Sequence, residues 1–332
     1  MRIALVVDNP HRDLPGLVLL GSYLARRGAT VYLAPMNLQA EELSALAPDL
    51  AVLNCLRRTN QATAAALLAA GVRLALLDTE GGVMESTDLY GRVMADDPEL
   101  RAGVSRVCFW GERLAGAARR EGWYPEEAIR VTGAPRFDLY APPWRRAALA
   151  RLGADRGVDG PRILVNSSFT LANPRFKRPE EESEMLVRRL GLDPEAVRRR
   201  LAAERAGLEG FLALADRLPR RFPEVTFVYR PHPFERVETY RSLVGSHRNL
   251  QVVAEGTVDG WLLGSSALIQ LSSTTAVEAA LAGVPSLSTD WLPTWHRLEP
   301  VEAVSISCSS EAALEDFLAG LLEGGEPPQP GP

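Results

Sequence analysis

The chain has 332 residues, of which 46% are hydrophobic and 24% are charged, and its formal net charge is −5. This length and composition are typical of a soluble protein with two domains, each large enough to bury a core. The negative charge argues against nucleic acid as the main partner, because proteins that bind a phosphate backbone usually present a basic surface. The three cysteines, Cys55, Cys108 and Cys308, have neither the spacing of a zinc site nor that of a disulfide framework.

The amino-terminal segment predicts a core strand and not a targeting signal. Residues 3–7 are too few for the apolar core of a signal peptide, and Asp8 follows them directly. No apolar run approaches the length needed to span a bilayer, so we expect a cytoplasmic protein. Arginine clusters on predicted helices, such as residues 198–200, are interpreted as solvated helix faces. An alternative is peripheral contact with the anionic inner face of a membrane.

The first half of the chain alternates short strands rich in valine and leucine with helices. The predicted strands are residues 3–7, 30–34, 50–53, 72–77, 106–110 and 129–132. The predicted helices are residues 15–27, 40–46, 60–70 and 112–121, with a polar loop over residues 78–97. This alternation predicts right-handed βαβ crossovers and a parallel sheet.

A segment rich in proline and glycine, residues 133–144, predicts a domain boundary, and a second α/β series follows it. Its predicted strands are residues 162–165, 225–229, 250–253, 267–271 and 285–287, and its predicted helices lie within residues 180–218, 275–282 and 311–322. The expected divisions are an N-terminal domain (1–140), a linker (141–160), a C-terminal domain (161–310) and a final helix (311–323). The tail, residues 324–332, has four prolines and three glycines and is expected to be disordered.

Two polar segments directly follow predicted strands of the second half. The first is Tyr229-Arg230-Pro231-His232-Pro233-Phe234-Glu235; the second comprises Ser272, Ser273, Thr274 and Thr275 and opens a helix. Open α/β sheets bind ligands outside the carboxyl ends of their strands, and a helix N-terminus attracts anions. Together the two segments predict a site for the monophosphate or diphosphate of a nucleotide.

The order of three short motifs resembles that of bacterial sialyltransferases and related Kdo (3-deoxy-manno-octulosonic acid) transferases, which have the GT-B glycosyltransferase fold. These families carry an acidic pair before glycine, then His-Pro, then Ser-Ser/Thr. The corresponding segments here are Asp78-Thr79-Glu80-Gly81-Gly82, His232-Pro233 and Ser272-Ser273-Thr274. CDP-glycerol glycerophosphotransferases also carry Arg/Lys-Pro-His-Pro and a later Ser-Ser, and the chain is similar to capsule and lipopolysaccharide biosynthesis proteins. The resemblance implies a GT-B architecture: two Rossmann-like domains whose parallel sheets face a central cleft.

Sugar transfer needs a base for the acceptor hydroxyl and positive charge for the leaving phosphate. Glu80 is the first candidate for the base and Asp78 the second; alternatively, Asp78 caps the following turn and Glu80 is solvated. His232 is expected to donate a hydrogen bond to the donor phosphate. Arg230 is expected to bind the same phosphate or a donor carboxylate, or alternatively to pair with Glu235.

The remaining candidates surround the same predicted site. Ser272, Ser273, Thr274 and Thr275 are expected to bind phosphate, or to cap the helix with Glu278 as the acid of a capping box. The resemblance implies that Glu278 binds the nucleotide ribose. Asn166, Ser167 and Ser168 follow the first strand of the second domain, where the fold has a phosphate or acceptor loop, although an ordinary turn is an equal alternative.

Together with these residues, the resemblance implies an inverting, metal-independent glycosyltransferase of surface polysaccharide synthesis that needs no cofactor. The best single donor is a CMP-linked acidic sugar, and the acceptor is a glycan or a lipid-linked glycan. No Asp-x-Asp segment is suited to a divalent ion, so no metal site is expected. The alternatives are a CDP-glycerol type transferase, a UDP-GlcNAc 2-epimerase-like enzyme and a non-catalytic nucleotide-binding or glycan-binding protein. The epimerase is disfavoured because residues 8–12 do not resemble that family's Gly-Thr-Arg-Pro-Glu.

Overall fold

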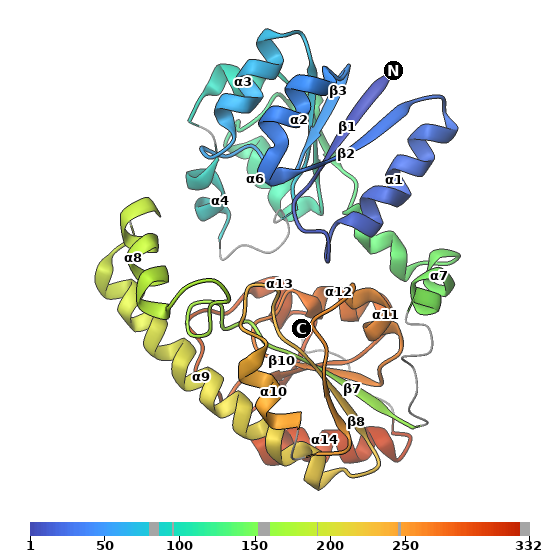
Figure 1. Ribbon diagram of the computed structural model, residues 1–332, viewed down its shortest axis with the longest axis vertical. Helices are drawn as coiled ribbons and strands as arrows, with labels where there is room; N and C mark the ends of the chain where they lie inside the picture. Colours follow the sequence, from blue (N-terminus) through green and yellow to red (C-terminus); the bar gives the residue numbers. More distant parts are fainter. Residues whose placement is uncertain (80–85, 95, 152–159, 191, 245–246, 326–332) are drawn as a thin grey trace. The chain divides into compact units, whose positions relative to one another are not determined.

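The computed structural model describes residues 1–79, 86–94, 96–151, 160–190, 192–244 and 247–325. The chain divides into two compact units, Met1–Leu139 and Tyr140–Pro332, and each is described by itself (Figure 1). Among the described residues, no helix is both long and apolar enough to cross a lipid bilayer.

The first unit is built on a sheet of six parallel strands in the order β2-β1-β3-β4-β5-β6. The strands are β1 (Arg2–Val7), β2 (Thr30–Pro35), β3 (Leu50–Leu53), β4 (Arg73–Leu77), β5 (Val104–Phe109) and β6 (Ile129–Val131). The central strands β1 and β3 are buried on both faces, as expected for a parallel sheet covered by helices, whereas the edge strands β2 and β6 are partly exposed. The chain pairs β2 on one side of β1 and β3 on the other, so the order reverses between β1 and β3.

Helices cover both faces of this sheet. They are α1 (Leu14–Arg26), α2 (Gln39–Leu46), α3 (Gln61–Ala69), α4 (Thr87–Val93), α5 (Pro98–Ala102) and α6 (Glu112–Arg120), with short 3-10 helices η1 (Met36–Leu38), η2 (Glu126–Ala128) and η3 (Pro135–Tyr140). Leu17 of α1 packs with Ile3 and Leu5 on one face. Leu43 of α2 and Leu67 of α3 join the larger core on the other. The unit is therefore doubly wound.

The second unit has its own sheet of six parallel strands, in the order β12-β11-β10-β7-β8-β9. The strands are β7 (Arg162–Asn166), β8 (Thr226–Arg230), β9 (Leu250–Val252), β10 (Ala267–Gln270), β11 (Ser286–Thr289) and β12 (Ile306–Cys308). From β7 the chain adds β8 and β9 on one side and then returns to add β10 on the other. The order of strands therefore reverses between β7 and β10.

The helices of the second unit are α7 (Trp144–Arg151), α8 (Pro179–Leu190), α9 (Pro194–Arg221), α10 (Glu238–Val244), α11 (Val258–Leu263), α12 (Thr275–Ala282), α13 (Glu299–Glu302) and α14 (Glu311–Leu322). The long α9 runs along the unit and packs against α8 (Figure 1). Phe211 of α9, Tyr240 of α10 and Leu314 of α14 bury one face of the sheet. On the opposite side α12 packs against both β10 and β11.

The prediction of an α/β chain with two parallel sheets is confirmed. The helical stretch over residues 180–218 is divided into α8 and α9, because Asp193 caps a new helix that has Pro194 in its first turn. The polar loop predicted over residues 78–97 contains α4, whose start is fixed by Ser86 Oγ accepting from Leu89 N at 3.0 Å.

Other elements were too short to show a period in the sequence. They are α5, α10, α11, α13 and the edge strand β12. Part of the predicted linker, residues 141–160, forms α7, which packs against α11. The predicted tail falls outside the described residues except for Gly324 and Gly325.

A glycine inside α9 allows the helix to approach the loop after β11. A Cβ atom on Gly207 would lie 2.3 Å from Pro293 O and 3.0 Å from the Phe169 ring. We expect Gly207→Ala to lower the free energy of unfolding by about 2 kcal/mol, because the clash outweighs the higher helix propensity of alanine. Gly320 in α14 meets nothing within 4 Å and is the matched control.

Chemical denaturation of both variants measures the difference. Gly320→Ala should raise the free energy of unfolding by about 0.5 kcal/mol. A Gly207→Ala variant as stable as the Gly320→Ala variant would contradict the close packing of α9.

Candidate functional site

The two polar segments singled out in the sequence flank the same strand. At the carboxyl edge of the second sheet, Arg230 of β8 pairs in register with Asn166 of β7, which pairs with Gln270 of β10. The order of strands reverses between β7 and β10, and such a reversal is where open α/β sheets bind ligands. The sheet therefore brings residues 230–233 and 272–275 to either side of the end of β7.

The segment before α12 is held by a set of polar contacts. The backbone N of Ser273 donates to Gln270 Oε1 at 2.8 Å, and Asn166 Nδ2 donates to Thr275 Oγ1 at 3.0 Å. Ser272 has a left-handed backbone with φ of 49°, and its hydroxyl donates to the backbone O of His296 at 2.9 Å. A strained non-glycine residue persists only where its surroundings fix it. These contacts hold the N-terminus of α12 at the edge of the sheet.

The helix N-terminus itself differs from the capping alternative. The N-cap residue is Thr274, which makes no cap bond through its side chain, and Thr275 is the first helical residue. Glu278 therefore lies one position beyond that of a capping-box acid, and it accepts a hydrogen bond from the Tyr140 hydroxyl at 2.5 Å. The capping-box interpretation of Glu278 is wrong.

The Glu235 carboxylate organises the loops that follow β7 and β8. It is fully buried and accepts four hydrogen bonds. The donors are Ser167 Oγ at 2.5 Å, Tyr240 OH at 2.6 Å, His232 N at 2.7 Å and Phe169 N at 2.9 Å. Burial raises the pKa of Glu235, while these donors act in the opposite direction.

His232 is positioned by its backbone and by its ring. Its N–H is bound by Glu235, and its Nδ1 accepts from the backbone N of Phe234 at 3.2 Å. Because Nδ1 is an acceptor, the proton of the neutral ring is on Nε2, which acts as a hydrogen-bond donor. The side chain lines a pocket of about 400 Å³ together with Ser168 and Arg175.

Arg230 does not pair with Glu235 as the alternative proposed. Its Nη1 and Nη2 donate to the backbone O of Glu255 at 2.8 Å and of Gly256 at 3.0 Å. Burial lowers the pKa of Arg230 to about 10, against the opposing effect of Asp259 and Glu255. The guanidinium therefore stays charged at neutral pH and fixes the loop after β9.

The three residues after β7 have different surroundings. The Asn166 side chain is buried, and its Oδ1 has no hydrogen-bond partner among the described residues. The Ser167 hydroxyl is used by Glu235, whereas Ser168 is exposed and lines the pocket beside His232. Asn166 and Ser168 are thus available to a ligand, and Ser167 supports the loop.

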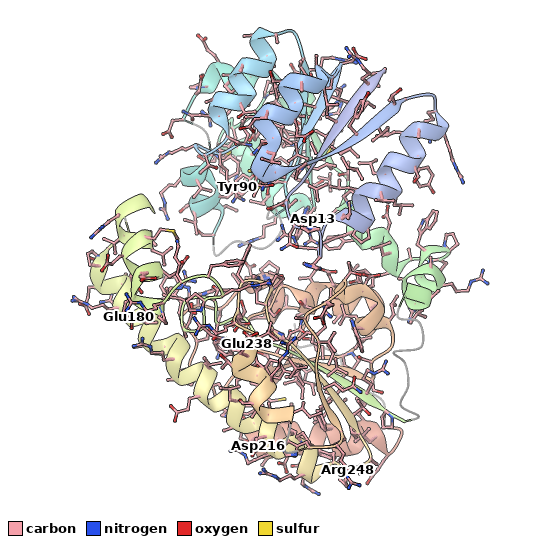
Figure 2. All side chains as sticks on the ribbon, viewed as in Figure 1. Asp13, Tyr90, Glu180, Asp216, Glu238 and Arg248 are labelled. Atoms are coloured by element: carbon pink, nitrogen blue, oxygen red, sulfur yellow. The ribbon has the colours of Figure 1, made fainter. Side chains whose placement is uncertain are left out.

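In the first unit, Asp78 lies in the interior at the end of β4. It is 3% exposed, accepts from the Tyr90 hydroxyl at 2.7 Å and lies 3.7 Å from Arg57 Nη2. Burial, followed by the charge of Asp78, raises the pKa of Tyr90, which is on α4 (Figure 2). Asp78 is therefore an interior hydrogen-bond acceptor. The other base candidate, Glu80, lies outside the described residues.

The reversal between β1 and β3 in the first unit is occupied by an ion network. Asp13, labelled in Figure 2, lies at the start of α1. It accepts from Arg136 Nη1 at 3.2 Å and from Arg12 Nε at 3.0 Å. Arg12 also reaches Asp8 at 2.9 Å, and Thr79 Oγ1 donates to Asp8 at 2.9 Å. The space left beside this network is only about 30 Å³, roughly one water molecule.

The hydrogen-bonding roles of two residues of the site were not predicted from the sequence. Glu235 and Gln270 both carry hydrogen bonds that shape the edge of the second sheet. Gln270 had a signal, because it is a polar residue at the end of an otherwise apolar strand. Glu235 follows His232 by three residues, but nothing in the sequence indicates which backbone amides it binds. In the part of the chain that the structure describes, no group of three or more His, Cys, Asp or Glu side chains is arranged to hold a metal ion.

We expect Glu235→Gln to lower the free energy of unfolding by about 2 kcal/mol, because an amide group would point a donor at partners that are themselves donors. Glu238, three residues on in α10, is the matched control (Figure 2). Its side chain is 70% exposed and 3.7 Å from Arg241, so Glu238→Gln should change stability by less than about 0.5 kcal/mol. Urea denaturation of the two variants checks this; equal stabilities would contradict the role of Glu235.

Comparison with known proteins gives the fold. No protein-family model and no curated protein sequence matches the chain. The UDP-GlcNAc 2-epimerase from Methanocaldococcus jannaschii has 13% identity and a TM-score of 0.63, with 99% of this chain and 94% of that chain covered. The UDP-GlcNAc 2-epimerase from Neisseria meningitidis, bound to UDP-GlcNAc, has 15% identity and a TM-score of 0.57, covering 97% and 92%.

A variant of the wall teichoic acid polymerase TagF has 12% identity and a TM-score of 0.60, covering 97% of this chain and 79% of that chain. TagF was also solved after a soak with CDPG. At these identities the likeness concerns the fold. The resemblance to sialyltransferases and Kdo transferases stays a prediction. The chain has the GT-B-like two-unit α/β architecture that the UDP-GlcNAc 2-epimerases and TagF share.

Proposed function

We propose that this protein is a transferase that uses a donor activated by a nucleoside diphosphate, in the synthesis of a surface polymer. One observation carries the proposal: the segment with Arg230 and His232 and the segment opening α12 flank the end of β7, where the strand order reverses. The pattern Arg230-Pro231-His232-Pro233 with the later Ser272-Ser273 supports a transferase of the CDP-glycerol type. The fold of TagF is consistent with it.

The donor phosphates would bind at the N-terminus of α12. The N–H groups of residues 275–277 already donate to Ser273 and Thr274, so the helix dipole is what favours an anion there, and the Ser273 and Thr274 hydroxyls can add hydrogen bonds. His232 Nε2–H would donate to the same phosphates, and the Arg230 charge would stabilise the negative charge that develops on the leaving group. The proposal thus assigns this stabilisation to side chains and a helix N-terminus, and not to a divalent ion.

Hydroxyl groups of the donor would be recognised by acceptor atoms beside the phosphates. The Asn166 Oδ1 atom is a buried acceptor that lacks a partner among the described residues, and a ligand hydroxyl would satisfy it. Glu278 is buried one turn into α12, where its carboxylate could bind the ribose while Tyr140 holds it. In this arrangement, hydrogen-bond donors of the protein bind the phosphates of the nucleotide, and hydrogen-bond acceptors of the protein bind its hydroxyl groups.

The CMP-linked acidic sugar expected from the sequence is replaced by a diphosphate donor. The solved proteins of the same fold were studied with UDP, UDP-GlcNAc or CDPG, and the comparisons lend no support to a CMP-linked sugar. CDP or UDP is therefore the expected carrier.

The second candidate is a UDP-GlcNAc 2-epimerase-like enzyme, which the fold comparisons favour. In this chain, however, residues 8–13 after β1 are engaged in the ion network of Asp8, Arg12 and Asp13. Their sequence also lacks the Gly-Thr-Arg-Pro-Glu of the epimerases. Incubation with UDP-GlcNAc alone distinguishes the two: an epimerase forms the 2-epimer, whereas a transferase needs an acceptor.

Nucleotide binding tests the site directly. We expect CDP or UDP to raise the melting temperature more than CMP does, because a second phosphate reaches more donors; a ligand at one hundred times its Kd adds about 2.7 kcal/mol. His232→Ala should weaken binding of that nucleotide about tenfold, since it removes a hydrogen bond to a charged group. The exposed His11 of the first unit is the control, and His11→Ala should bind as the wild type does. No stabilisation by any of these nucleotides would refute the proposal.

The base is tested by a pair of variants. Glu80→Gln should abolish product formation while nucleotide binding is retained, because a base acts on the acceptor hydroxyl and not on the nucleotide. Asp78→Asn should instead lower stability, since Asp78 is buried against Tyr90 and Arg57. Assay of transfer from CDP-glycerol, with thermal denaturation of both variants, measures this. Full activity in Glu80→Gln would exclude it as the base.

A further inference from the structure

A pocket of about 400 Å³ lies within the second unit, beside the proposed phosphate site. It is bounded by the loop after β7, the segment after β8, and helices α8 and α9. The charged side chains of its wall are Arg175, Lys177, Glu182 and Arg200, and its other polar side chains are Ser168, Thr170 and His232. We call it the basic pocket. Its volume is in the range of small-molecule sites.

The charge of the basic pocket is positive. Its wall has three cations and one carboxylate, and that carboxylate, Glu182, lies 3.5 Å from Lys177 Nζ. Arg175 Nη1 donates to the backbone O of Pro233 at 3.2 Å. Because a carbonyl group carries no net charge, this hydrogen bond does not neutralise the guanidinium. Arg200 forms an ion pair with Glu204 at 2.8 Å, so Arg175 is the cation of the wall that has no ion pair among the described residues. The Glu204 carboxylate is also shared with backbone amides of the loop after β7.

The wall is held in place before any ligand arrives. Arg175 N donates to the backbone O of Phe234 at 2.8 Å, and Arg236 N donates to the backbone O of Asn173 at 3.0 Å. Asn173 is also bound through its side chain, to the backbone O of Arg236 at 3.0 Å and to the Thr239 hydroxyl at 2.8 Å. The loop after β7 is therefore fixed to the segment that follows His232, which preorganises the backbone that carries Arg175.

The rim of the pocket is aromatic. Phe176 and Phe234 also line it and are 75% and 55% exposed, although both are large apolar side chains. Exposed aromatic faces beside polar groups are suited to the apolar face of a sugar or polyol. The pocket thus combines an oxyanion-binding wall with a surface for a carbohydrate-like body.

We propose that the basic pocket binds a phosphate group of the acceptor, the substrate that carries no nucleotide. The inference rests on the proposed function, and it names the chemistry of the second substrate. His232 is shared by the two sites, and Ser168 is separated by one residue from Asn166 at the phosphate site. An acceptor held here by Arg175 and Lys177 would therefore lie next to the leaving phosphate, as transfer requires.

Glycerol 3-phosphate is the probe, titrated into the full-length protein by calorimetry with and without saturating CDP or UDP. The double variant Arg175→Gln/Lys177→Gln should raise its Kd at least about tenfold, because two hydrogen bonds to a charged group are lost. The matched control is Arg198→Gln/Arg199→Gln. These arginines lie on α9 beside Arg200 but are 73% and 67% exposed and pair with Glu195. The control should bind the probe like the wild type.

The outcomes separate the two proposals. Simultaneous binding of nucleotide and glycerol 3-phosphate, with only the latter weakened in the pocket variant, supports the inference. Displacement of the probe by nucleotide, equal weakening of nucleotide binding in the pocket variant, an unchanged Kd, or no saturable binding of the probe overturns it. Binding of the probe in the basic pocket without binding of any nucleotide overturns the proposed function and leaves an anion site.

Discussion

The buried carboxylate of Glu235 is the interaction on which the edge of the second sheet depends. A carboxylate in the interior loses its hydration, and the loss is tolerable only where hydrogen-bond donors replace water. Here those donors come from three different segments: the loop after β7, the segment after β8, and α10. The Glu235 carboxylate therefore determines how the two loops pack against each other. Their packing in turn sets the direction of the His232 ring and the position of the wall of the basic pocket. A residue with no direct part in the proposed chemistry thus fixes the geometry of the residues that have one.

The two units use the same position of the fold differently. Each sheet has a reversal of strand order at its carboxyl edge, between β1 and β3 in the first unit and between β7 and β10 in the second. In the first unit, Arg12 pairs there with the carboxylates of Asp8 and Asp13, Arg136 pairs with Asp13, and little space remains. In the second, the described contacts of Arg230 run to carbonyl groups, and a large pocket is lined by His232, two residues further along the chain. The reversal in the first unit is thus filled by an internal salt network, whereas the reversal in the second holds a buried acceptor, Asn166 Oδ1, that has no partner among the described residues.

The sequence predicts the strands and the long helices well, because buried parallel strands read as apolar runs and a helix of α9's length repeats its period many times. It also locates residues 230–233 and 272–275 correctly at strand ends, since a polar residue after an apolar run marks that edge. Partners distant in the chain could not be predicted. The bond between Ser167 and Glu235 joins residues 68 apart, and that between Tyr140 and Glu278 joins residues 138 apart. The sequence around Asp78 does not indicate whether its carboxylate faces a ligand or an internal partner. In the structure its partner is the Tyr90 hydroxyl.

The electrostatics of Arg230 show why the second sheet is suited to an anion. Burial removes water from the guanidinium and lowers its pKa to about 10, yet this value still leaves the group charged at neutral pH. The carbonyls of Glu255 and Gly256 solvate the charge without cancelling it, while the carboxylates of Asp259 and Glu255 act on it through space. Because the carbonyl groups carry no net charge, the positive potential of Arg230 extends along the carboxyl edge of the second sheet. The N-terminus of α12, at the same edge, adds a positive potential of its own. A phosphate bound at this edge would be attracted by the Arg230 guanidinium and by the N-terminus of α12. Neither group would have to give up its internal hydrogen bonds.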